Sequence, residues 1–226
     1  MVPAERAPLL HLPGVTRGLT IERGSEALSS GNPGLDRLTG GGFPRGRLSE
    51  VSGPASSGRT SLLYSLLATA TGRGEVVALV DPRDRFHPAC AAAAGVELAR
   101  VLWVRPREAP QALRAAEILL STRGFGAVIL DLADGLAPAL SLRFGVAWPR
   151  LAHRAATSRG ALIVLSDRRM VDGSAHLCLA LSEPRMIWPT HRLRARLFGG
   201  IESRARVVRT RRGAPGEAAR LRLAEA

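Results

Sequence analysis

The stretch GPASSGRT has the glycine spacing of a loop that binds phosphate. In that pattern two glycines stand five positions apart, and a basic residue and a hydroxyl residue follow the second one. Gly53, Gly58 and Thr60 keep this arrangement, and Ser57 belongs to the same loop. Backbone N–H groups and the start of the next helix can surround an anion there. The residue between Gly58 and Thr60 is Arg59, where such loops carry lysine.

Arg59 changes the chemistry that the loop could perform. Lysine is a compact charge that reaches the terminal phosphates of a nucleotide, whereas arginine is a bulkier planar fork with a different reach. The chain contains no lysine at all. A general preference for arginine accounts for that composition, but a lysine essential for hydrolysis should survive such a bias. We therefore interpret the loop as a degenerate nucleotide site, which predicts no resident cofactor and at most weak binding of ATP and magnesium.

A carboxylate at the end of a strand would be the second element of a nucleotide site. The apolar run AVILD ends at Asp131, and this residue type contacts magnesium in such sites. Asp131 is open to two interpretations, a metal carboxylate or the polar end of a strand, and the missing lysine favours the second. A water-activating carboxylate is hard to place, because the run VALVD is followed by Pro82, Arg83 and Asp84. The sequence predicts no catalytic residue and no resident metal.

Short apolar strands that alternate with helices would position this loop and Asp131. Helical periodicity is clearest after the loop, where leucines recur at the spacing of one helix face. Such alternation is typical of an α/β protein with a mostly parallel sheet flanked by helices. We expect strands at 47–53, 75–81, 101–104, 127–131 and 161–167, and helices at 35–38, 60–70, 85–94, 109–122 and 148–159.

The C-terminal part of the chain, 185–226, is strongly basic. It contains eleven arginines and three glutamates, and so carries +8 of the net charge of +13. Basic and aliphatic residues alternate there, which predicts antiparallel strands with one wet face at the C-terminal end of the sheet. This face could be only solvated, or it could bind DNA or an acidic protein, and the local excess of charge favours binding. The candidate binding residues are Arg192, Arg194, Arg196, Arg204, Arg206, Arg209, Arg211 and Arg212.

The overall composition suits a globular protein. With 226 residues and 46% hydrophobic residues the chain can bury a core. We expect residues 1–24 to form an N-terminal arm and residues 25–226 to form a single domain. No apolar run approaches the roughly 20 residues that span a bilayer, and the two cysteines form neither a disulfide framework nor a metal-ligand spacing. These features predict a cytoplasmic protein without a membrane partner.

Several stretches resemble bacterial RecA. LSSGNPGLDRLTGGGFPRGRLSEVSGPASSGRTSLL is similar to the opening of the RecA core, with its G-L-D turn and glycine run before the nucleotide loop. VVALVDPRDRFHPACAAAAGVELARVLWVRP resembles the next segment, and RARVVRTRRGAPGEAARLRL the last core strands. The likeness covers roughly Ser25 to Leu223 and implies a RecA-like core ATPase fold.

The departures from RecA concern its functional residues. By this resemblance Arg83 occupies the position of the catalytic glutamate, Arg59 that of the loop lysine, and Ser166 with Asp167 that of the switch Asn-Gln. The two loops that hold single-stranded DNA in RecA correspond to short segments at 132–147 and 168–175. These departures count against DNA pairing, filament growth and ATP turnover.

A shortened RecA relative with this pattern of loss is similar to the ImuA family of translesion-synthesis accessory proteins. That resemblance implies a non-catalytic adaptor in the SOS response to DNA damage, docking an ImuB-like polymerase-fold protein and RecA, with DNA as a further candidate partner for the basic face. Two alternatives stay open. One is a weak ATP-dependent recombinase of the RecA family that binds DNA, and the other is a SulA-like inhibitor of the division protein FtsZ.

Overall fold

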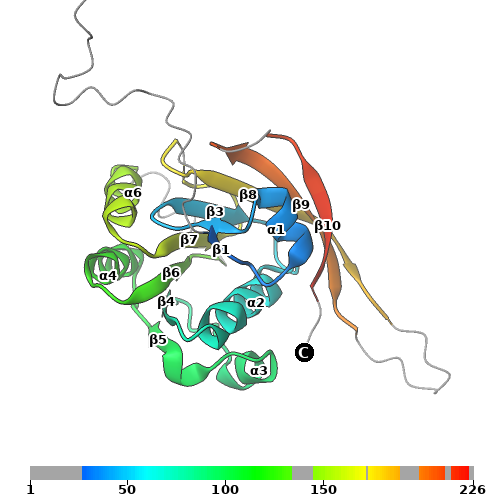
Figure 1. The fold of residues 1–226 in the computed structure, drawn as a ribbon, viewed down its shortest axis with the longest axis horizontal. Helices are drawn as coiled ribbons and strands as arrows, with labels where there is room; N and C mark the ends of the chain where they lie inside the picture. Colours follow the sequence, from blue (N-terminus) through cyan, green and yellow to red (C-terminus); the bar gives the residue numbers. More distant parts are fainter. Residues whose placement is uncertain (1–26, 134–144, 172, 189–198, 212–214, 224–226) are drawn as a thin grey trace, which may run out of the picture.

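The computed structural model of this chain describes residues 27–133, 145–171, 173–188, 199–211 and 215–223. Its centre is an eight-stranded sheet in the order β10-β9-β8-β3-β7-β6-β4-β5 (Figure 1). Strands β3 to β8 pair in parallel, and β8, β9 and β10 pair antiparallel, which confirms the expected fold class. The strands are β3 (Leu48–Ser52), β4 (Val76–Val80), β5 (Val101–Val104), β6 (Phe125–Asp131), β7 (Ala161–Ser166), β8 (Leu177–Met186), β9 (Ile201–Thr210) and β10 (Ala218–Leu223).

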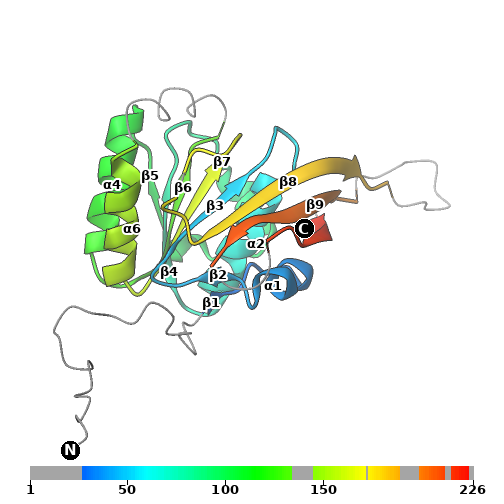
Figure 2. The same cartoon turned by 90° about the horizontal axis from the view of Figure 1, so that it is seen from above.

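Helices cover both faces of the parallel strands (Figure 2). Helices α2 (Arg59–Gly72) and α3 (Pro88–Ala93) pack on one face, and α4 (Ala109–Ser121) and α6 (Ala147–Thr157) on the other. Each strand therefore serves two cores. In β4, Val77 and Leu79 join the α2 layer, while Ala78 and Val80 join the α4 layer. Burial on both faces is why these strands are continuous apolar runs in the sequence.

The free edge of β10 is closed by α1 (Pro33–Thr39), the short helix before β3. Asn32 caps this helix, since its side-chain oxygen accepts hydrogen bonds from the N–H groups of Gly34 and Leu35 at 3.0 and 3.1 Å. Its Nδ2 also donates to the carbonyl of Arg222, at 3.0 Å. One side chain thus starts a helix and occupies a backbone acceptor that an edge strand would otherwise expose.

The element bounds differ from the expected ones at several places. Helix α3 begins at Pro88 instead of Arg85, because His87 caps it through Nδ1 and the preceding residues form a turn. Strand β6 begins two residues earlier than expected, at Phe125. A second small sheet, made by β1 (Ala27–Leu28) and β2 (Phe43–Pro44), was not predicted, because two-residue strands have no readable periodicity. A 3-10 turn, η1 (Leu98–Arg100), precedes β5.

Two of the expected segments fall on residues that the structure does not describe. The N-terminal arm, 1–24, is one of them, and most of the first expected DNA-binding loop, within 134–144, is the other. Within the described part of the chain, no helix has the length and apolar character needed to cross a membrane.

Candidate functional site

The glycine loop joins the central strand β3 to helix α2, as the sequence predicts. Gly58 has φ +91°, and a side chain there would run into that of Leu223. Gly53 donates its N–H to the carbonyl of Ser166 at 3.1 Å, which fastens the loop to the end of β7. No side chain caps the start of α2. The backbone geometry that presents N–H groups to an anion is therefore retained.

Arg59, the first residue of α2, pairs with an acidic residue of the protein itself. Its Nη1 lies 2.9 Å from Oδ1 of Asp167, and the two side chains are 10% and 30% exposed. Asp167 directly follows β7, on the strand adjacent to β3. The guanidinium that faces the loop is thus already neutralised by a carboxylate. An incoming phosphate must displace Asp167 or tolerate its negative charge nearby.

Three aspartates stand at the carboxyl ends of neighbouring parallel strands. Asp81 follows β4, Asp131 ends β6 and Asp167 follows β7, and these three strands are consecutive in the sheet. Asp131 is half-buried, and its Oδ1 accepts a hydrogen bond from the N–H of Ala133 at 3.2 Å. The loop, Arg59 and this carboxylate thus lie at the same end of the sheet, where the parallel strands end.

Asp81 organises the turn that would carry a catalytic glutamate. Its Oδ2 accepts hydrogen bonds from the N–H of Phe86 at 2.9 Å and from Nε1 of Trp103 at 3.2 Å. The Phe86 ring stacks edge to face with Trp103 and with Tyr64 of α2. Arg83 is exposed on the same turn. The position that the resemblance assigns to the catalytic glutamate is therefore a solvent-facing arginine, beside an aspartate that is fixed by aromatic neighbours.

Two hydroxyl groups are buried at the same end of the sheet, where the parallel strands end. Ser57 Oγ and Ser166 Oγ are shielded from solvent and make no hydrogen bond to any residue in the described ranges. Thr60, by contrast, is exposed at the start of α2. The hydroxyl that would accompany a bound magnesium ion is thus available, while the basic residue before it is engaged with Asp167.

The segment after β7 is attached to the sheet by a buried carboxylate. Glu50 of β3 is fully buried, and its Oε1 accepts hydrogen bonds from the N–H groups of Met170 and Val171 at 2.7 and 3.0 Å. Burial raises the pKa of the neighbouring Cys178 thiol to about 11, with a further contribution from the Glu50 charge. The thiol therefore stays protonated at neutral pH and does not act as a nucleophile.

The second candidate region is an arginine-rich sheet face. Arg204 and Arg206 of β9 and Arg220 and Arg222 of β10 are exposed, and we call these four residues the arginine surface. They alternate with buried Ala205, Val207, Leu221 and Leu223, which pack toward α2. Arg204 stands directly opposite Arg220 in the strand register. This face therefore has an excess of positive charge. Like charges across a strand pair repel each other, and an anionic partner would reduce that repulsion.

Acidic residues at the rim neutralise part of this charge. Arg204 pairs with Glu183 at 3.1 Å and Arg220 with Glu202 at 3.4 Å. Arg206 and Arg222 form no ion pair with a residue of the described ranges, so they are the two members best placed to meet a partner.

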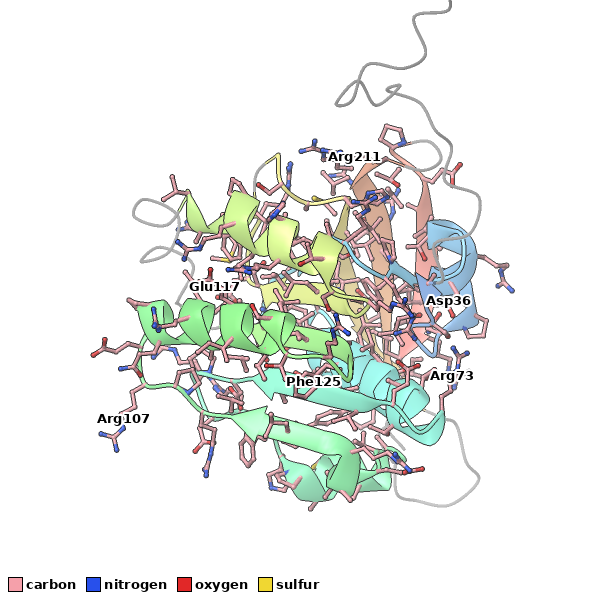
Figure 3. The ribbon with its side chains drawn as sticks, turned by 60° about the vertical axis from the view of Figure 1, so that its left-hand side comes forward. Asp36, Arg73, Arg107, Glu117, Phe125 and Arg211 are labelled. Carbon is pink, nitrogen blue, oxygen red and sulfur yellow. The ribbon has the colours of Figure 1, made fainter. Side chains whose placement is uncertain are left out.

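The remaining candidates of this group divide in two. Arg209 is half-buried opposite Cys178, and Arg211 is exposed beyond the end of β9 (Figure 3). Arg192, Arg194, Arg196 and Arg212 lie outside the described residues.

Asp81 and the pairing role of Asp167 were not found as site features from the sequence. A usable signal was present, because VALVD, AVILD and VLSD each place an aspartate at the end of an apolar run. Among described residues, no group of three or more His, Cys, Asp and Glu side chains is arranged to hold a metal ion.

Comparison with known proteins gives a consistent relationship. The family model described as the RecA N-terminal domain matches residues 15–163. Protein RecA of Chlorobium chlorochromatii is 33% identical over 138 residues, which are 61% of this chain and 38% of that protein. Protein RecA of Chlorobaculum parvum is 38% identical over 118 residues, 52% of this chain and 34% of that protein. The chain therefore spans little more than a third of the length of these relatives.

A solved structure shows the same fold. The RadB recombinase superposes with a TM-score of 0.66 at 23% sequence identity, over 88% of this chain and 96% of that one. At that level of identity the superposition concerns the arrangement of strands and helices alone.

Proposed function

Because this chain belongs to the RecA N-terminal domain family, we propose that it is a non-catalytic RecA-like accessory protein of mutagenic translesion DNA synthesis. In this role it resembles the ImuA family and docks an ImuB-like polymerase-fold protein and RecA. The RecA-like scaffold then serves as a platform for partners, and no step of the proposal requires ATP hydrolysis.

The ion pair between Arg59 and Asp167 is the observation that carries this proposal. In an active nucleotide loop the basic residue neutralises the terminal phosphates. Here Arg59 is nearly buried and held 2.9 Å from a carboxylate of the same chain. Arg83 at the position of the catalytic glutamate supports the same conclusion, since arginine does not act as a general base at neutral pH.

The arginine surface supports an adaptor role. It belongs to the antiparallel strands at the end of the sheet, away from helices α4 and α6 (Figure 1). An exposed basic face with only partial neutralisation attracts acidic proteins or nucleic acid. The same face also carries Ala218 on β10, Ser182 on β8 and Glu202, which stands opposite Arg222, so arginines outnumber the acidic residues there.

A combined binding and hydrolysis experiment tests the proposal. The purified chain is immobilised and challenged with a purified ImuB-like protein and with RecA, while ATP turnover is measured with and without single-stranded DNA. We expect capture of both partners without nucleotide and no DNA-stimulated hydrolysis. The variant R206Q/R222Q tests the surface, and R107Q/R114Q, which changes exposed arginines on and beside α4, is the matched control. DNA-dependent hydrolysis that disappears in Arg59→Ala would contradict the proposal.

The second candidate is a weak ATP-dependent recombinase, which the retained backbone of the loop favours. Gly53 and Gly58 keep their geometry, and Asp131 stands at the end of β6. Calorimetry with ATP and magnesium separates the two candidates, since a recombinase must bind nucleotide and an adaptor of this kind need not. No heat of binding at millimolar ATP would eliminate the recombinase.

A further inference from the structure

A hollow lies between the C-terminal ends of α4 and α6, at the end of the sheet where the parallel strands begin. The glycine loop lies at the other end of these strands. Its volume is about 600 Å³, within the roughly 300–1,000 Å³ typical of ligand sites. Residues 120–125 form one wall, and Arg154 with residues 157–159 forms the other. In Figure 3, Phe125 lies at this end of α4 and Arg107 at the other.

Three arginines, Arg123, Arg154 and Arg159, are among the residues that line this hollow. Arg123 and Arg159 are exposed and form no ion pair with a described residue. Two acidic residues lie near the hollow. Glu75, beside Gly126, is paired with Arg45 at 2.8 Å, and Oε1 of Glu117 lies 3.0 Å from Nε of Arg150 and 4.0 Å from Nε of Arg154. The Glu117 carboxylate is thus engaged mainly by Arg150, outside the hollow, and the wall keeps a surplus of positive charge.

The three arginines lie at or near the C-terminal ends of α4 and α6. The last carbonyls of a helix attract cations, which is the ordinary explanation for arginines at such a place. A guanidinium has five N–H donors, so these arginines keep donors for a ligand beyond any attraction to the helix ends. Hydroxyl groups also donate to carbonyls of the last turns. Ser121 Oγ donates to the carbonyl of Glu117 and Thr122 Oγ1 to that of Ile118, at 2.9 and 3.0 Å. In α6, Thr157 Oγ1 donates to the carbonyl of Arg154 at 2.9 Å.

Two glycines lie at this end of the sheet, and one of them, Gly124, lines the hollow. Gly124 has φ +110°, and an added Cβ would meet no atom within 4 Å. Gly160, in contrast, presses against the carbonyl of Phe125 and fixes the separation of β6 and β7 at this end.

We infer that this hollow is a binding site for a compact ligand with two adjacent phosphate groups. Three arginines from the two walls of one hollow suit a small polyanion, because a guanidinium presents paired N–H donors to phosphate oxygens. An extended polymer would instead need a stripe of charge along a surface. A diphosphate could come from a free nucleotide, and terminal phosphates could come from the end of an oligonucleotide.

The site is independent of the glycine loop and of the proposed function. Phe125 begins β6 and Asp131 ends it, so the seven-residue strand separates the two sites by roughly 20 Å. A ligand in the hollow therefore cannot contact Arg59 or Asp167.

Calorimetry on the full chain with inorganic pyrophosphate tests this inference. We expect saturable binding that R123Q/R159Q weakens at least tenfold, about the effect of losing one charge-assisted contact. R107Q/R114Q removes two exposed arginines on and beside the same helix, outside the hollow, and should bind like the unchanged chain. ADP and a 5′-phosphorylated dinucleotide are titrated in parallel. Tighter binding of ADP indicates a free nucleotide as the source of the phosphates, and tighter binding of the dinucleotide indicates the end of an oligonucleotide.

Each other outcome overturns the inference. Absence of pyrophosphate binding at millimolar concentration means that the hollow takes no such anion. Equal binding by R123Q/R159Q places the anion elsewhere, the glycine loop included. An equal loss in R107Q/R114Q shows a non-specific effect of net charge. All three results are independent of whether the chain docks polymerase-type partners.

Discussion

Arg59 on helix α2 and Asp167 at the end of β7 form an ion pair of 2.9 Å inside the glycine loop region. The pair joins the start of α2 to the end of β7, two places that a bound nucleotide would otherwise bridge. The Asp167 carboxylate takes the place beside Arg59 that a bound phosphate would take, so the loop is stabilised without a ligand. Both residues were singled out in the sequence, whereas their pairing depends on the fold.

A double-mutant cycle with Arg59→Ala and Asp167→Ala measures this pair. We expect a coupling free energy of about 1–3 kcal/mol in the free energy of unfolding, less than for a fully buried pair because Asp167 is 30% exposed. Urea denaturation of the four proteins provides the values. Additive effects of the two substitutions would show that the pair contributes nothing specific.

Removing the charge of Asp167 should make the loop a better phosphate site. Asp167→Asn removes the negative charge that lies 2.9 Å from the Arg59 guanidinium, so the loop region repels phosphate less and we expect ATP to bind at least tenfold more tightly than to the unchanged chain. Calorimetry without magnesium reports the effect. Asp84→Asn is the control. Asp84 is exposed on the turn after β4, and it pairs with Arg105, which follows β5. A gain of the same size in both variants would indicate net charge as the cause.

The sequence was sufficient for the parallel sheet, its helices and the loop, because these depend on local periodicity and on glycine positions. Asp131 could be placed at the strand ends for the same reason. The contact of Leu223 with Gly58 and the hollow below Phe125 could not be predicted, since each joins segments far apart in the chain. The packing of α1 on the edge of β10 depends likewise on tertiary structure. Side-chain pairing at the strand ends required the strand order, which periodicity does not provide.

The buried thiol of Cys178 should make stability depend on pH in the alkaline range. Its pKa rises from 9.0 to about 11 on folding, mainly through burial. Below pH 9 the thiol is protonated in both states. Between pH 9 and 11 the unfolded chain loses the proton first, so the free energy of unfolding should fall as pH rises, by up to about 3 kcal/mol. Urea denaturation of the chain and of Cys178→Ala at each pH isolates this contribution, and parallel curves would refute it.

Asn32 should stabilise the protein through two separate contacts. Asn32→Ala removes the helix cap of α1 and the bond to the carbonyl of Arg222, and we expect a loss of about 1–2 kcal/mol in the free energy of unfolding. Asn32→Asp keeps the cap acceptor and loses only the donor, so its loss should be about half as large. Thermal and urea denaturation compare the variants. Equal losses in both would assign the whole effect to the contact with β10.

The arginine surface should bind single-stranded DNA with an affinity that falls as salt rises. Each phosphate contact contributes about −0.7 to the slope of log K against log salt for a single strand, so R206Q/R222Q should reduce the magnitude of the slope by about 1.4. Fluorescence anisotropy with a labelled oligonucleotide between low and moderate salt gives both slopes. These two arginines are exposed and lack an ion pair with a described residue, so their removal leaves the pairs to Glu183 and Glu202 intact. R107Q/R114Q should keep the original slope. An affinity that is absent or independent of salt would assign this surface to a protein partner.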